Sequence, residues 1–149
     1  MPRGLLITIY AVISVTALIA TWSQNLAYFG PSAAARGALG PFEGFVADTA
    51  ANPAARSITV DIGLFLMAAA VFMVIEARRL KVRFVSAYIA LGFLVAISVT
   101  FPLFMIAREL RLAKQPGAPI AVLTITDWIT LVLTASVVAL VSARVLGAI

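Results

Sequence analysis

The stretch from Phe84 to Ala107, FVSAYIALGFLVAISVTFPLFMIA, decides the fold class because it is a long apolar run without a single charge. A helix that crosses a lipid bilayer needs about 20 consecutive, mainly apolar residues. The run meets that requirement, so the sequence predicts a transmembrane helix at about 84–106. A membrane protein is therefore the first hypothesis for the chain.

The composition of the whole chain supports this hypothesis. Of the 149 residues, 63% are hydrophobic and only 11% are charged. An ordinary soluble domain is nearer half apolar and a quarter charged, and a small globule buries only part of its apolar surface. The composition excludes an ordinary soluble enzyme, a disordered chain and a disulfide scaffold. We expect an all-α, polytopic membrane protein with a single domain over residues 1–149.

Three further apolar stretches, at about 4–22, 57–75 and 120–143, bring the expected number of spans to four. The first follows Arg3 and has the layout of a signal peptide. However, the sequence Ala20-Thr21-Trp22-Ser23 matches a small-residue cleavage site poorly. We interpret this stretch as an uncleaved signal-anchor helix.

The first loop, at about 23–56, is longer than most connections in compact proteins. Within it, Phe42, Phe45 and Val46 recur at helical spacing, whereas Glu43 and Asp48 fall elsewhere. This pattern predicts a short amphipathic helix at about 42–50 that lies on the outer membrane surface. A lid over the outer ends of the helices is the alternative interpretation.

The orientation depends on where the basic residues fall. If the N-terminus is cytoplasmic, straight spans place six Lys and Arg residues inside and five outside. The density is more informative, because four bases crowd the shortest loop: Arg78, Arg79, Lys81 and Arg83. We expect this loop and both termini to be cytoplasmic, and the four bases to contact lipid headgroups.

Small residues at a spacing of four form two ridges suited to close helix packing in lipid. The third span carries Gly92, Ala96 and Thr100, and the fourth carries Ala135, Ala139 and Ala143. These ridges could close the helices against one another or dock a helix of a partner.

Two acidic residues lie inside apolar spans, where an ionisable group is a functional hypothesis by default. Asp61 is about one turn into the second span, and Asp127 is within two turns of the start of the fourth. Straight spans would place both on the outer side with Arg56 and Arg108. We expect an outer-leaflet cluster of these four residues, which serves either as structural ion pairs or as a binding or proton-handling site.

The absence of Cys and His limits the chemistry of the chain. It excludes a disulfide, a thiolate nucleophile, an iron–sulfur cluster and His-ligated haem, and no Ser has a base to activate it. We therefore expect neither an enzyme nor haem or metal ligation, and no role in nucleic-acid binding. The cofactor is unknown, and an apolar pigment or quinone stays open because such contacts leave no sequence code.

A series of polar motifs between Phe45 and Lys114 resembles a known family. The series is Asn52-Pro53-Ala54-Ala55, Asp61, Glu76-Ala77-Arg78-Arg79-Leu80, Pro102-Leu103-Phe104 and Arg108-Glu109. It is similar to a family of small bacterial integral membrane proteins catalogued only as a domain of unknown function. The resemblance implies three or four spans in a bacterial inner membrane, and it implies no activity or catalytic residue.

These observations lead to one main hypothesis and two alternatives. The main hypothesis is a non-enzymatic accessory or assembly subunit that packs against a larger membrane complex or a second copy. The first alternative is a small transporter or channel component that uses the outer Asp/Arg cluster. The second is a subunit that binds a pigment or a quinone.

Overall fold

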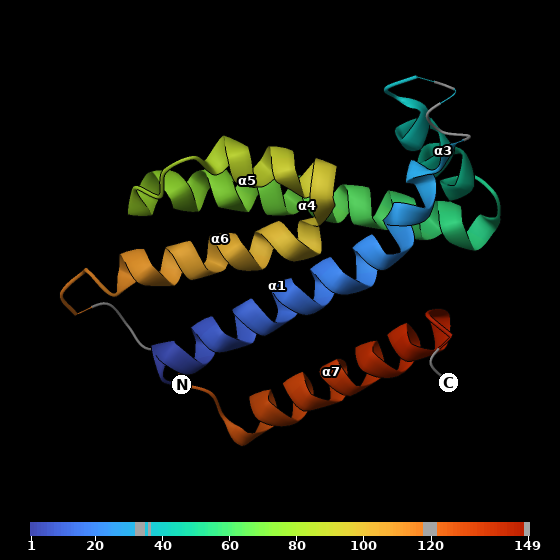
Figure 1. Ribbon diagram of the computed structural model, residues 1–149. Coiled ribbons are helices and arrows are strands. Elements are labelled where there is room, and N and C mark those ends of the chain that lie inside the picture. Colours follow the sequence, from blue (N-terminus) through green and yellow to red (C-terminus); the bar gives the residue numbers. More distant parts are fainter. Residues whose placement is uncertain (32–34, 36, 118–121, 148–149) are drawn as a thin grey trace.

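The computed structural model describes residues 1–31, 35, 37–117 and 122–147, and all regular structure in this part of the chain is helical. Four helical segments are long and apolar enough to cross a membrane, which confirms the all-α membrane fold. They are α1 with η1 (Arg3–Asn25 and Leu26–Phe29), α4 (Pro53–Leu80), α5–η2–α6 (Val85–Leu91, Gly92–Ala96 and Ile97–Leu112) and α7 (Ile125–Val145). Figure 1 shows their arrangement.

A short helix, α3 (Gly40–Thr49), occupies the first loop at the predicted position. It packs against η1, where Tyr28 Oη donates to Asp48 Oδ2 at 2.7 Å. The rings of Tyr28 and Phe45 meet edge to face, with centroids 5.6 Å apart. This contact fixes α3 beside the point where α1 ends and α4 begins.

Local sequence determines both ends of α4. Asn52 caps its first turn by accepting a hydrogen bond from the Ala55 N–H at 2.9 Å, and Pro53 occupies the first helical position. At the other end Lys81 adopts a left-handed conformation, with φ of 55°. The helix of 28 residues is about 42 Å long, which exceeds the roughly 30 Å hydrocarbon core of a bilayer.

The third apolar segment does not form the single straight span that its length predicts. Its helical path is interrupted at Ala96, whose backbone is extended (φ 178°, ψ 142°) and separates the π-helical turn η2 from α6. Beyond this residue α6 runs back alongside α5 (Figure 1). As a result, the rings of Tyr88 and Phe104 meet with centroids 5.8 Å apart, whereas a straight helix would separate them by about 24 Å. Residues 85–112 are a helical hairpin.

Helix α1 holds this hairpin by packing antiparallel on α6. Buried Ser14 donates from Oγ to the carbonyl oxygen of Val99 at 3.0 Å. Trp22 Nε1 donates to the carbonyl oxygen of Val95 at 3.3 Å. Both acceptors lie within three residues of the interruption, so α1 supplies donors where the helical hydrogen-bond ladder is broken.

The apolar core lies between α4 and the hairpin. Met73 and Phe104 are fully buried at its centre, and smaller buried side chains surround them. Phe72 packs against the rings of both Phe101 and Phe104. The core is therefore built from the second and third apolar segments, and α1 closes it from one side.

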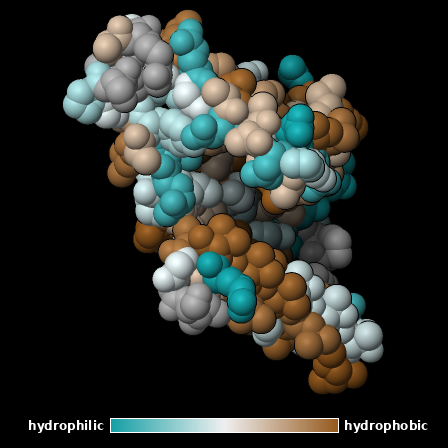
Figure 2. Space-filling view, turned by 90° about the vertical axis from the view of Figure 1, so that its right-hand side faces the viewer, coloured by the Kyte–Doolittle hydropathy of each residue, from teal (hydrophilic) through white to brown (hydrophobic). Residues whose placement is uncertain are grey.

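Helix α7 is the exception, because none of its residues is buried. Figure 2 shows continuous apolar surface along the lower part of the molecule, where α7 lies. Figure 1 places the end of α7 opposite the start of α1. The two lie at opposite ends because the hairpin returns the chain to the end where it began; that both termini are cytoplasmic stays a prediction.

Candidate functional site

A network of ion pairs among the described residues is centred on Glu76, near the end of α4. Its side chain is 8% exposed. Arg79, one turn further along α4, donates to both carboxylate oxygens, with Nε 2.7 Å from Oε2. Arg108 of α6 donates from Nε to Oε1 at 2.7 Å. A carboxylate buried in an apolar helix thus receives three charge-assisted hydrogen bonds.

A second buried carboxylate, Glu109, lies beside the first. It is 5% exposed and accepts a hydrogen bond from Arg108 Nη1 at 2.6 Å. On its other side Arg3 forms an ion pair, with Nε 3.6 Å from Oε2. Arg108 therefore bridges both carboxylates with two nitrogens of one guanidinium group. We call Arg3, Glu76, Arg79, Arg108 and Glu109 the ionic cluster.

The fold brings the cluster together from three helices. It contains the first turn of α1, the last turns of α4 and the last turns of α6, all at the same end of the molecule (Figure 1). Only the reversal at Ala96 makes this possible, since a straight segment would carry Arg108 to the far end of α4. The cluster is thus a direct consequence of the hairpin.

The ion pairs of the cluster join the ends of three helices. Burying two carboxylates is costly, and the cost is recovered only when geometry and hydrogen bonding are good, as they are here. Removing one partner from such a network leaves a charge without compensation. The cluster therefore makes the relative positions of α1, α4 and α6 interdependent.

The predicted outer-leaflet cluster does not form. Arg108 lies against Glu76, which is 20 residues and thus about 30 Å along α4 from Arg56. Asp61 is exposed near the start of α4, about 22 Å from Glu76 by the same measure. Asp127 is exposed and accepts hydrogen bonds from the Thr124 N–H and hydroxyl, at 2.8 Å each, in a capping box that begins α7.

The two small-residue ridges have different environments. Gly92 and Thr100 face each other across the hairpin, where a Cβ on Gly92 would lie 3.1 Å from Thr100 Oγ1. These residues permit close packing within the chain. On α7 the residues Ala135 and Ala139 are exposed and Ala143 is half-buried, so this ridge takes no part in the apolar core of the described chain.

The four bases of the turn after α4 also divide into two groups. Arg79 belongs to the ionic cluster through Glu76. By contrast, Arg78, Lys81 and Arg83 form no ion pair with any described carboxylate. Sequence reasoning grouped all four together because a helix viewed alone does not reveal which of its residues meets a neighbour.

Sequence reasoning missed Glu109 and Arg3 as members of a site. One signal was available, since Glu76 and Glu109 are acids close to bases at the ends of the second and third apolar runs. Their separation of 33 residues gave no indication of contact, because straight spans place them on opposite membrane surfaces. The reversal at Ala96 is the missing information.

One family model matches the chain, over residues 9–110, and its description is "Protein of unknown function DUF2834". The match includes four of the five cluster residues, from Glu76 to Glu109, and ends before α7. Neither the curated proteins nor the solved structures contain a match to the chain. Because the family model covers more than half of the sequence, the chain belongs to this family.

Proposed function

We propose that this member of the DUF2834 family is a non-enzymatic accessory or assembly subunit, which joins a larger membrane complex through α7. The observation that carries the proposal is the state of α7: it is a full-length apolar helix with no buried residue. The ionic cluster and the apolar core unite α1, α4 and the hairpin without it. The chain thus has a cohesive body and a separate helix available for contact.

The surface of α7 suits helix association in lipid. Apolar burial gives no driving force between helices in a bilayer, so association depends on close van der Waals packing at small residues. Ala135, Ala139 and Ala143 recur every four residues and form such a strip along one face. Large side chains, among them Val137 and Val141, occupy the opposite face and suit contact with lipid.

The distribution of charge supports an orientation with the N-terminus in the cytoplasm of a bacterium. Eight basic residues lie at the end of the molecule where α1 begins and α4 and α6 end: Arg3, Arg78, Arg79, Lys81, Arg83, Arg108, Arg111 and Lys114. The described basic residues at the opposite end are Arg56 and Arg144. This imbalance favours an orientation with the basic end in the cytoplasm and the end of α7 on the outer side.

The transport alternative has less support than assembly. It depended on an outer cluster of acids and arginines, and the fold places Arg108 beside Glu76, about 30 Å along α4 from Arg56 and about 22 Å from Asp61. Asp127 has a sufficient role as a helix cap. We therefore place assembly first, and flux measurements or extractable pigment would be the observations to revive the other hypotheses.

The experiment that tests assembly is purification from the native membrane under mild detergent, followed by native mass spectrometry. The intact protein is expected to carry a defined partner, which is a second membrane protein or a further copy of this chain. The variant Ala139→Leu, which thickens the small-residue strip, should lose the partner. Val141→Leu on the opposite face is the matched control and should retain it.

Two results would contradict the proposal. One is recovery of the native chain only as a monomer, with no partner at any detergent concentration that preserves helicity. The other is equal loss of the partner in Ala139→Leu and Val141→Leu. Equal loss would indicate that general stability, rather than the small-residue strip of α7, decides the association.

A further inference from the structure

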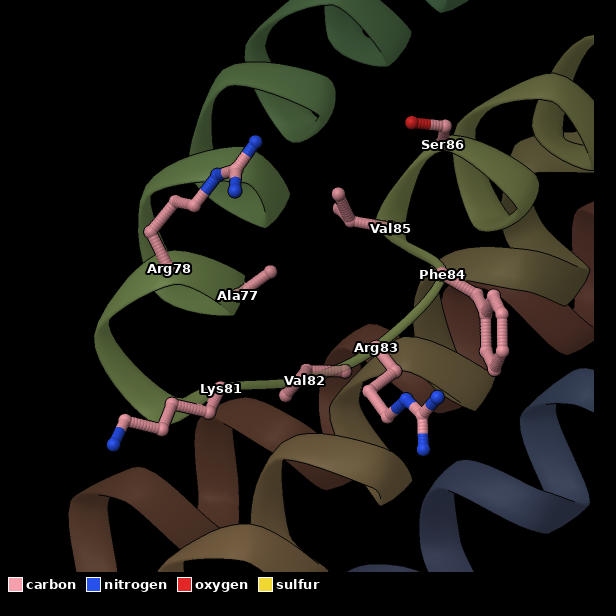
Figure 3. A pocket seen from close by; sticks show the side chains of 8 residues that line it. All are labelled: Ala77, Arg78, Lys81, Val82, Arg83, Phe84, Val85 and Ser86. Atoms are coloured by element: carbon pink, nitrogen blue, oxygen red, sulfur yellow. The ribbon is translucent and has the colours of Figure 1, made fainter.

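An open pocket of about 530 Å³ lies beside the turn between α4 and α5 (Figure 3). Its lining combines apolar side chains with cations and one hydroxyl group: Ala77, Arg78, Lys81, Val82, Arg83, Phe84, Val85 and Ser86. Ala77 and Val85 border the open space in Figure 3, and the Ser86 hydroxyl points toward it from the side of α5. The pocket thus has an apolar floor and a polar edge.

The backbone of the turn creates this space. Lys81 and Phe84 both adopt left-handed conformations, with φ of 55° and 62°. The Val82 N–H donates to the Ala77 carbonyl oxygen at 3.0 Å, which ends α4 tightly. The chain therefore turns twice within four residues and holds the start of α5 away from the last turn of α4.

Three cationic residues line the pocket without a carboxylate partner among the described residues; in Figure 3 the Arg78 side chain lies beside the open space, and the charged ends of Lys81 and Arg83 extend outward from its rim. Arg78, Lys81 and Arg83 are exposed and form no ion pair among the described residues. Arg83 lies over the ring of Phe84, with its guanidinium carbon 5.3 Å from the ring centroid. Arg79, in the same turn, forms an ion pair with Glu76, so its charge is neutralised and does not add to the positive charge of the pocket. The pocket therefore carries positive charge that no acid within the described chain neutralises.

The position of the pocket indicates the source of a compensating anion. Helix α4 is longer than the hydrocarbon core is thick, and its basic last turns suit the headgroup layer. Three bases at that level attract the anionic lipids of the inner leaflet. The apolar floor adjoins the cations, which matches a molecule whose phosphate group is attached to acyl chains.

We propose that this pocket binds the phosphate group of an anionic phospholipid of the inner leaflet. Arg78, Lys81 and Arg83 provide the charge, Ser86 Oγ donates a hydrogen bond to a phosphate oxygen, and Ala77, Val82 and Val85 contact the first carbons of the acyl chains. The inference is independent of the proposed assembly through α7, which lies on a different part of the molecule. In this proposal Arg78, Lys81 and Arg83 bind lipid, whereas Arg79 belongs to the ionic cluster.

The test is a lipid titration of the purified full chain, followed by native mass spectrometry. Phosphatidylglycerol is compared with phosphatidylcholine of the same acyl chains, and inorganic phosphate is added in a separate series. The double variant Arg78→Gln/Lys81→Gln is compared with the control Arg111→Gln/Lys114→Gln, which removes the same charge from the same end of the molecule. Circular dichroism verifies that each variant retains its helicity.

The expected result is a preference for phosphatidylglycerol that the pocket variant loses by on the order of tenfold in affinity. The control variant should retain most of it. Equal losses in the two variants would overturn the proposal, because they would indicate attraction by general surface charge. Displacement of the lipid by millimolar inorganic phosphate would also overturn it, since the ligand would then be a soluble phosphate. Equal affinity for phosphatidylglycerol and phosphatidylcholine would also overturn the proposal, because the pocket would then not select an anionic lipid.

Discussion

Arg108, on the last turns of α6, donates a hydrogen bond from Nε to Oε1 of Glu76, on the last turns of α4, over 2.7 Å. Straight spans would place these two residues on opposite membrane surfaces. They are in contact because the third apolar segment reverses direction at Ala96. The hydrogen bond joins α6, the second arm of the hairpin, to α4. The ionic cluster is built around this pair.

Arg108→Gln is expected to destabilise the protein by on the order of 3 kcal/mol, because it removes a guanidinium from two buried carboxylates at once. Arg111→Gln, one turn away on α6 and outside the cluster, should cost much less. Arg108→Lys should recover only part of the loss, since an ammonium group lacks the planar fork that bridges two acids. Thermal or denaturant unfolding in detergent measures all three, and equal stability of the two Gln variants would contradict a structural role for the cluster.

Ser14→Ala should lower stability by about 1 kcal/mol, because it removes the buried hydrogen bond to the Val99 carbonyl oxygen. Ser23→Ala is the control on the same helix, where the hydroxyl bonds only to its own helix at an exposed position. The same unfolding assay compares them. A neutral Ser14→Ala would show that α1 does not hold the hairpin through this donor.

Gly92→Val should destabilise the hairpin by about 1–3 kcal/mol through overpacking, since the new Cβ would lie 3.1 Å from Thr100 Oγ1 and 3.4 Å from Ile97 Cδ1. Gly63→Val makes the same chemical change on α4, where nothing lies within 4 Å of the new Cβ. The difference in melting temperature between the two variants isolates the contact across the hairpin. Gly63→Val as the more damaging change would contradict the packing described for Gly92.

The sequence predicted the helical, membrane-embedded nature of the third apolar segment but not its reversal into two arms. Its apolar length predicted a membrane-embedded helix, and the spacing of Phe42 and Phe45 predicted α3. The reversal at Ala96 could not be predicted, because the run from Phe84 to Ala107 contains no charge. A straight transmembrane helix and a helical hairpin can have the same apolar composition.

The candidate site was missed for the same reason. Arg108 was expected to lie with the acids Asp61 and Asp127, an expectation that depended on a straight third span. Its observed partners Glu76 and Glu109 entered the sequence analysis only through the family resemblance. Which residues form ion pairs between helices depends on the topology. One incorrectly assumed chain direction therefore changes all of the expected partners.

Lys114→Cys gives a test of topology, because the native chain contains no Cys. The hairpin places residue 114 at the same end as the turn after α4, so a thiol there should react with a membrane-impermeant maleimide only from the cytoplasmic side. Thr49→Cys, in α3 at the other end, should react only from the outside. Labelling of both variants from the outside would instead support a straight third span.

The most direct test of the hairpin is disulfide formation in the double variant Gly92→Cys/Thr100→Cys. The Cβ position of residue 92 lies 3.1 Å from Thr100 Oγ1, which is within disulfide range, whereas a straight helix separates residues eight apart by about 12 Å. Gly63→Cys/Val71→Cys has the same separation in sequence along α4 and is the control. After mild oxidation in the membrane, alkylation and intact mass measurement, the account predicts no free thiols in the first variant and two in the second. Two free thiols in both variants would contradict the reversal at Ala96, and with it the ionic cluster.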